Sequence, residues 1–157
     1  MEGQVLSIEQ MQYLQKLGID TSKAKMAYYA IYETEPNWYN ELRIRDEVFD
    51  KYYPSIPTFT LQDMLEMMPP RLYSFPFEDK ERYVIHDMVM NRLTGEWLIG
   101  YRHGLIKGEL LVSFQDDLLT CAYETLCWLA ENNYIGGKNE NKIAKTTSQK
   151  GTKIRQI

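Results

Sequence analysis

Apolar residues recur at helical spacing after Ser7 and predict a short amphipathic helix over 8–17. Ser7 and Gln10 have the spacing of a capping box, which satisfies free backbone N–H groups at a helix start. Gly18 follows the last turn, where a residue in the left-handed conformation often ends a helix. We therefore expect this helix to begin after Ser7 and to end at Gly18.

The strongest helical pattern lies over 116–133, where one broad face is apolar and the opposite face is acidic. The apolar face is formed by Leu118, Leu119, Ala122, Leu126, Leu129 and Ala130. A shorter helix is predicted over 61–68, because Thr60 can cap its first turn and Pro69-Pro70 stops it.

Runs of β-branched and aromatic residues, separated by short turn-like links, predict the strands. These runs cover 26–33, 38–44, 72–77, 82–91, 96–102 and 110–114. The links between the later strands are too short for crossovers, so we expect an antiparallel meander. Pro54 and Pro57 are expected to exclude regular structure between them, and 45–53 suits either a helix or a loop. The predicted fold class is α+β: an antiparallel β-meander sheet of four to six strands, packed against a long C-terminal helix plus two shorter helices.

The turn of the central hairpin predicts its register. Gly95 suits the left-handed position of a three-residue loop, whereas a two-residue loop would force the β-branched Thr94 to positive φ. In the three-residue loop Arg92 faces Glu96. The resulting core face consists of Ile85, Val89, Trp97, Ile99 and Tyr101, and the opposite face of His86, Met88, Met90, Leu98, Gly100 and Arg102.

Charge divides the chain into two parts. The net charge is −4, but residues 138–157 carry six basic residues and one acid, and the remainder is acidic. The apolar content also falls after Gly137. We therefore expect one globular domain over 1–137 and a basic tail over 138–157 that is disordered when free.

The cysteines and the lengths of the apolar runs indicate the cellular compartment of the protein. Cys121 and Cys127 form no CxxC pair, which indicates reduced thiols and a cytoplasmic protein. No run of apolar residues is long enough to span a membrane, and the first ten residues do not have the pattern of a signal peptide. We expect a protein that does not contact membranes.

Catalytic and metal-binding patterns are sparse. In the predicted hairpin Asp87 faces Tyr101 and lies diagonal to His103, an arrangement in which a carboxylate could orient a histidine as a general base. No nucleophile is placed beside this pair by the sequence, so an ordinary sheet-edge pair is the simpler interpretation. No histidine or cysteine spacing typical of a metal site is present, and no cofactor motif occurs. We predict no catalytic residue, cofactor or metal, and keep a hydrolase-like enzyme that uses Asp87 and His103 as an alternative.

Aromatic residues supply the candidates for protein contact. Trp128 falls among the acidic positions of the 116–133 helix, so it is either covered by another segment or offered to a partner. The stretch 28–53 is rich in tyrosine, which suits a recognition surface as well as a half-buried sheet. The candidate contact residues are Trp128, Tyr28, Tyr29, Tyr32 and Trp38.

The basic tail is the candidate for anion binding. Its cations are Lys138, Lys142, Lys145, Lys150, Lys153 and Arg155. Nucleic acid is the natural ligand of such a segment, although no aromatic residue lies between the cations to read bases. A solvated tail, or a peptide that orders on a protein partner, is equally compatible with this composition.

Two segments carry a resemblance. Residues 57–66, with the sequence PTFTLQDMLE, and residues 118–135, with the core LCWLAEN, resemble segments of uncharacterised small proteins of phages and integrated mobile elements of gut Bacteroides-type bacteria. In that group a glycine is found where this chain has Asn133. The resemblance implies a phage or mobile-element setting inside a bacterium and no mechanism.

These observations favour a non-enzymatic accessory or protein-interaction protein of a phage or mobile element, with a protein partner or a homo-oligomer as its contact. The alternatives are a nucleic-acid-associated protein that uses the C-terminal tail and the hydrolase-like enzyme.

Overall fold

The computed structural model describes residues 4–34, 37–74, 84–102 and 109–136. Within these residues the helices are α1 (Ile8–Lys16), α2 (Glu47–Tyr52), α3 (Leu61–Met67) and α4 (Leu118–Glu131). The strands are β1 (Met26–Thr34), β2 (Asn37–Ile44), β3 (Ser55–Thr58), β4 (Arg71–Ser74), β5 (Val84–Leu93), β6 (Glu96–Arg102) and β7 (Glu109–Gln115). The α+β class is confirmed, and the segment 45–53 forms a helix where the sequence was ambiguous.

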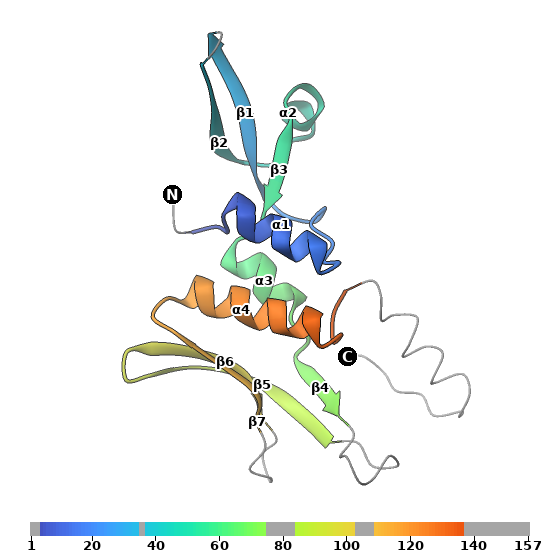
Figure 1. Cartoon of the computed structure of the whole chain (residues 1–157), viewed down its shortest axis with the longest axis vertical. Helices are drawn as coiled ribbons and strands as arrows, with labels where there is room; N and C mark the ends of the chain where they lie inside the picture. The colour runs from blue at the N-terminus through green and yellow to red at the C-terminus, as the bar shows by residue number, and fades with distance from the viewer. Residues whose placement is uncertain (1–3, 35–36, 75–83, 103–108, 137–157) are drawn as a thin grey trace, which may run out of the picture.

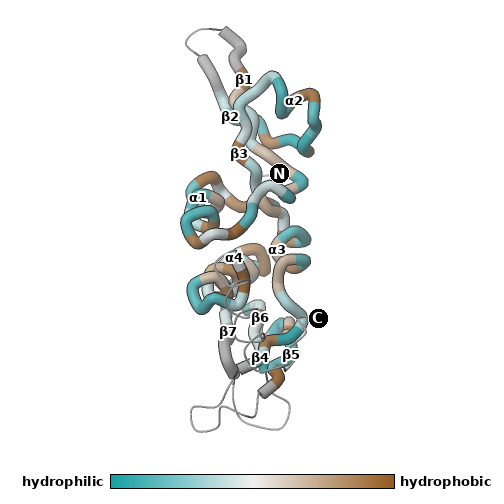
Figure 2. Tube along the Cα trace, turned by 90° about the vertical axis from the view of Figure 1, so that its right-hand side faces the viewer, coloured by the Kyte–Doolittle hydropathy of each residue, from teal (hydrophilic) through white to brown (hydrophobic). Residues whose placement is uncertain are grey.

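The strands form two separate antiparallel sheets, with orders β2-β1-β3 and β4-β5-β6-β7. The predicted antiparallel meander is confirmed for the later strands, which form a sheet of four. The strands of 26–58 form a sheet of their own, a point that the sequence pattern did not decide. Figure 1 shows the three-stranded sheet and α2 at one end of the elongated molecule and the four-stranded sheet at the other. Helices α1, α3 and α4 lie between the two sheets, which is also visible from the side (Figure 2).

The three-stranded sheet contains a strand that the sequence argument excluded. Strand β3 includes Pro57, which pairs with Ala27 of β1. Proline lacks the N–H that a central strand needs, but β3 is at the edge of its sheet and pairs only with β1 among the described strands. The prediction that Pro54 and Pro57 exclude regular structure was therefore wrong.

The central hairpin has a different register from the predicted one. Leu93 faces Glu96, which leaves a two-residue turn in which Thr94 has a φ of 49° and Gly95 a φ of 96°. Thr94 thus occupies the conformation that was thought too costly for a β-branched residue. Because side chains alternate along a strand, this one-residue slip exchanges the two faces of β5.

The consequence for the core is specific to β5. Its His86 is buried and Met88 packs against the core, whereas Ile85 is exposed. Strand β6 was predicted correctly, since Ile99 and Tyr101 are buried. The predicted core face is therefore right for β6 and wrong for β5.

Helix α1 begins and ends as the sequence predicts. Ser7 and Gln10 form the capping box, with backbone-to-side-chain bonds of 2.9 and 3.2 Å. Gly18 has a φ of +87°, and the N–H of Ile19 donates to the carbonyl of Leu14 at 3.1 Å, as in a Schellman motif. Ile19 and Leu14 are both buried, so the cap also adds to the core.

Helix α4 ends in the same way, but without glycine. Asn133 has a φ of 64°, and the N–H of Tyr134 donates to the carbonyl of Leu129 at 2.8 Å. Asparagine tolerates this left-handed conformation better than other residues with a side chain. Asn133 therefore serves as the left-handed residue that ends α4.

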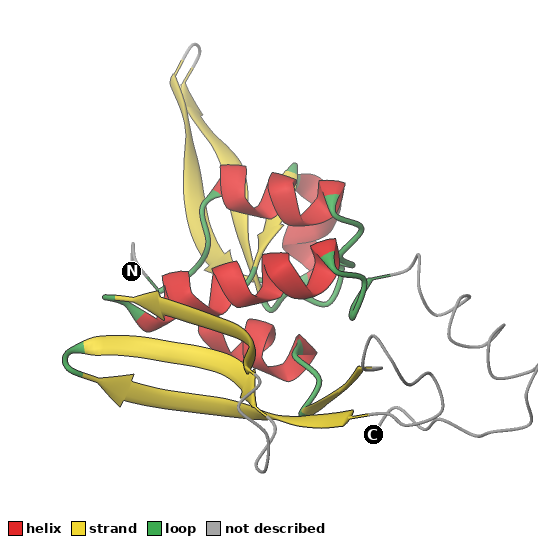
Figure 3. Cartoon of the chain, turned by 60° about the horizontal axis from the view of Figure 1, so that its bottom comes forward, coloured by secondary structure: helices red, strands yellow, loops and turns green. Residues whose placement is uncertain are grey.

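The main core lies between the helices and the four-stranded sheet (Figure 3). Its fully buried larger side chains are Leu6, Met11, Leu14, Phe59, Met64, Ile99, Tyr101, Leu126 and Leu129. Helix α4 packs against β6 and β7 on one side and against α3 on the other. None of the described helices is long and apolar enough to cross a membrane.

Candidate functional site

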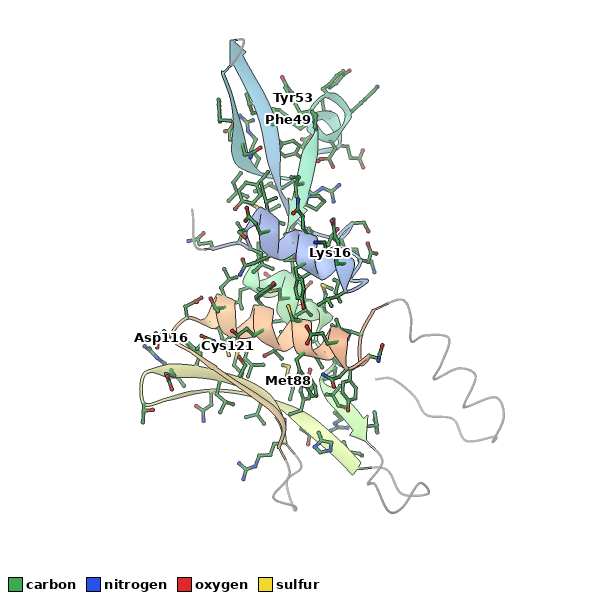
Figure 4. The ribbon with its side chains drawn as sticks, viewed as in Figure 1. Lys16, Phe49, Tyr53, Met88, Asp116 and Cys121 are labelled. Carbon is green, nitrogen blue, oxygen red and sulfur yellow. The ribbon has the colours of Figure 1, made fainter. Side chains whose placement is uncertain are left out.

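One face of the three-stranded sheet is covered by α2. Tyr29 of β1 is fully buried there, and its ring meets Phe49 edge-on at a centroid distance of 5.4 Å. Phe49 in turn stacks on Tyr53 at 4.9 Å, and the guanidinium of Arg43 lies 4.6 Å from the Phe49 ring centroid. Figure 4 labels Phe49 and Tyr53 beside the sheet. We call this side the covered face.

A half-buried carboxylate network fixes α2 to the covered face. The hydroxyl of Tyr29 donates to Asp50 Oδ1 at 2.5 Å, and Arg45 donates to Asp50 Oδ2 from Nη2 at 2.8 Å and from Nε at 3.1 Å. The hydrogen bond from Tyr29, followed by that from Arg45, lowers the pKa of Asp50. Burial, together with the Asp50 contact, raises the pKa of Tyr29, so its hydroxyl remains a neutral donor.

The opposite side of the sheet carries no charged residue among its described side chains. We call it the open face, and it is formed by Met26, Tyr28, Ala30, Asn40, Leu42, Ile44 and Ile56. The register places Leu42 and Ile56 on either side of Tyr28. All of these side chains are at least partly exposed, and Ile44 is 75% exposed.

At the end of the open face nearest the helices, the N-terminal segment packs against β3. Thr58 is buried there and donates from Oγ1 to the carbonyl of Leu6 at 2.7 Å, while the N–H of Leu6 bonds the carbonyl of Phe59 at 3.0 Å. These bonds join the three-stranded sheet to the helical layer. The open face therefore begins next to the segment that attaches this sheet to the helical layer.

The structure separates the aromatic contact candidates. Tyr28 lies on the open face, but Tyr29 lies on the covered face and is inaccessible to a partner. Tyr32 and Trp38 are register partners at the far end of the β1–β2 hairpin, where the structure describes the backbone alone. Tyr29 is thus a structural residue, and Tyr28 remains a candidate.

Trp128 is covered by a neighbouring segment, as one of the two sequence-based alternatives expected. It is partly buried, packs against the main core and stacks on Tyr134 with a centroid distance of 5.4 Å and an interplanar angle of 20°. Tyr134 reaches this position because the chain reverses at Asn133. Much of the indole surface is therefore used within the chain.

The residues of the hydrolase alternative do not form a described site. Asp87 pairs with Arg102 across the hairpin rather than with Tyr101, and its Oδ1 lies 2.7 Å from Arg71 Nε in an exposed ion pair. His103 lies outside the described residues. No described geometry therefore links a carboxylate to this histidine.

Both cysteines are buried free thiols. Cys121 lies on the side of α4 that faces the four-stranded sheet (Figure 4), and its Sγ donates to the carbonyl of Ser113 of β7 at 3.2 Å. Burial raises the pKa of Cys121 and raises that of Cys127 to about 11. These groups are unreactive thiols at neutral pH.

Within the described ranges, no group of three His, Cys, Asp or Glu side chains could hold a metal ion. The basic residues of the tail, Lys138 to Arg155, lie outside the ranges that the structure describes. Nucleic-acid binding by that tail therefore stays a prediction.

No protein-family model, curated protein or solved structure matches this chain. The open face is accordingly the candidate functional site on the strength of its own residues. Sequence reasoning missed Leu42, Ile44 and Ile56. The signal for the first two was present, because charged residues in β2 occur only at the alternating positions 41 and 43.

Proposed function

We propose that this protein is a non-enzymatic accessory protein of a phage or mobile element that binds a partner protein inside the bacterial cytoplasm. The contact surface is the open face of the three-stranded sheet. The phage or mobile-element setting is supported by the resemblance of residues 57–66 and 118–135 to small proteins of such elements.

The observation that carries the proposal is the uncharged, aliphatic and aromatic composition of the open face. The centres of protein interfaces are depleted in charged residues and enriched in tyrosine. Ile44 at the end of β2 is 75% exposed, although burying such a side chain is worth roughly 1.5–3 kcal/mol. A partner that covers Ile44, Leu42 and Tyr28 would gain this free energy.

Affinity purification from the bacterial host tests the proposal with a matched pair of variants. Ile44→Asp places a charge on the open face, and Met90→Asp places the same charge at a 47% exposed position of the four-stranded sheet. The full-length wild type and Met90→Asp should co-purify the same protein in stoichiometric amount, and Ile44→Asp should lose it. Equal recovery with Ile44→Asp would exclude the open face as the contact.

A further inference from the structure

The outer edge of β2 is not paired with any strand that the structure describes. Among the described strands β2 pairs only with β1, and it is eight residues long. Such an edge is a template for another strand unless charge, proline or a bulge blocks it. The other edge of the same sheet is blocked by Pro57 in β3.

The backbone hydrogen bonds show which residues of β2 direct their main-chain groups to the open edge. The N–H of Arg45 bonds the carbonyl of Lys25, and the N–H of Ala30 points away from β2 to the carbonyl of Pro54. Because bonding alternates along an antiparallel pair, Glu41 and Arg43 direct their main-chain groups to β1. The residues that direct theirs to the open edge are Asn40, Leu42 and Ile44.

The two charged residues next to this edge, Glu41 and Arg43, carry opposite charges, so the edge of one copy can complement the edge of a second copy. Glu41 and Arg43 are two residues apart on the covered face, and Arg43 Nη2 contacts Glu41 Oε2 at 2.9 Å with both side chains partly exposed. Two β2 strands can be placed antiparallel about a two-fold axis through Leu42. Glu41 of each copy then faces Arg43 of the other, and no like charges of this pair meet.

We infer that two copies of this chain join edge to edge through β2, with Leu42 on the two-fold axis. Leu42 then forms a doubly hydrogen-bonded pair with Leu42 of the second copy. On either side of this pair, Asn40 of one copy faces Ile44 of the other. Glu41 and Arg43 of the two copies fall at the non-hydrogen-bonded positions, where Cα atoms are only about 4.5 Å apart. The strand that pairs with this edge is therefore β2 of a second copy, because both its charges and its main-chain hydrogen-bonding groups match.

The pairing would join three strands from each copy into one sheet. The axis is perpendicular to the sheet, so both open faces lie on the same side and both α2 helices on the other. The dimer goes beyond the proposed function, because the edge can pair whether or not a partner binds the open face.

Charge exchange tests the register. Glu41→Arg gives a chain with two positive charges at the edge, and Arg43→Glu gives one with two negative charges. Each variant alone should dimerise at least about tenfold more weakly than the wild type in sedimentation equilibrium. An equimolar mixture of the two should recover a heterodimer, because every facing pair is again of opposite charge.

A second pair of variants tests the main-chain contact. Asn40→Pro removes an N–H that points to the open edge, so it should abolish the dimer, and Asn40→Ala retains the N–H and should keep it. Far-ultraviolet circular dichroism verifies that both variants are folded. A wild type that is monomeric throughout the accessible concentration range, or a mixture of the charge variants that stays monomeric, overturns the inference.

The partner experiment separates the two proposals. Glu41→Arg leaves the open face unchanged, because residue 41 is on the covered face. Loss of the dimer with retained capture of the partner supports both proposals. A monomeric wild type that still captures its partner through Ile44 overturns the dimer alone.

Discussion

Trp128 stacks on Tyr134, six residues later, because the backbone of Asn133 turns the chain back over the last turn of α4. An indole at the acidic side of the helix is thereby converted into part of the core. The two rings and the helix end form one structural unit, and changes at any of them should affect the stability of the others.

Replacing Trp128 by alanine should lower the free energy of unfolding by about 3 kcal/mol, because it removes both core packing and the stacking partner of Tyr134. Urea unfolding followed by circular dichroism measures this loss. Trp128→Phe, which keeps a ring, should lose less than half as much. A full retention of stability in Trp128→Ala would mean that the indole is a surface group available to partners.

The left-handed residue at the end of α4 gives a second prediction. Asn133→Gly should be neutral or slightly stabilising, whereas Asn133→Val should cost about 1–2 kcal/mol, since a β-branched residue resists a φ of 64°. Thermal unfolding of the two variants would reveal the difference. Equal melting temperatures would show that the turn relaxes to another conformation.

The hairpin turn predicts a gain of stability by a single substitution. Thr94 holds a φ of 49°, and the dipeptide preferred in such two-residue turns is Asn-Gly. Thr94→Asn should therefore raise the free energy of unfolding by about 1 kcal/mol. Thr94→Val, which keeps the β-branch, serves as the control and should give no gain in the same urea titration.

Asp50 should make the three-stranded sheet sensitive to acid. Its hydrogen bonds hold the pKa in the folded protein below the ordinary value of 3.8, so the unfolded chain takes up a proton more readily. The stability that Asp50 contributes is present above that ordinary pKa and is lost as the pH falls through the lower, folded-state value.

Urea titrations at about pH 6 and about pH 3 should therefore show a larger difference for the wild type than for Asp50→Asn. Tyr29→Phe, which removes the hydrogen bond that lowers the pKa of Asp50 most, should have an intermediate pH dependence. An identical pH dependence in all three proteins would contradict the role of Asp50.

The two thiols should be protected in the native state. With a pKa of about 11, Cys127 has about a thousandfold less thiolate than thiol at about pH 8, and Cys121 is fully buried. Reaction with a thiol reagent should be slow in buffer and rapid in denaturant. Rapid native modification of one thiol would indicate local opening around α4.

The elements that depend on local interactions could be predicted from the sequence. Ser7 and Gly18 set the bounds of α1, because capping involves residues that are neighbours in the chain. Strand β6 has the predicted bounds, 96–102, because the turn residues that precede it are also a local signal. The pairing of strands depends on distant residues, so the division into two sheets and the pairing of β3 with β1 could not be read from the pattern.

The hairpin register failed for a different reason. The prediction weighed only the local cost of a positive φ at Thr94, whereas the observed register places His86 and Met88 on the side of Ile99 and Tyr101. For the candidate site, the tyrosine-rich stretch indicated the right region. The choice of Tyr28 over Tyr29 required knowledge of which face α2 covers.

The position of α4 has a consequence for the synthesis of the protein. Strands β4 to β7 are complete once Gln115 has been translated, yet the helix that covers this sheet follows them in the chain. Until Glu131 has left the ribosome, the side of this sheet that α4 covers in the folded protein has no cover from that helix. A chaperone that shields this side during translation would prevent the aggregation to which such intermediates are prone.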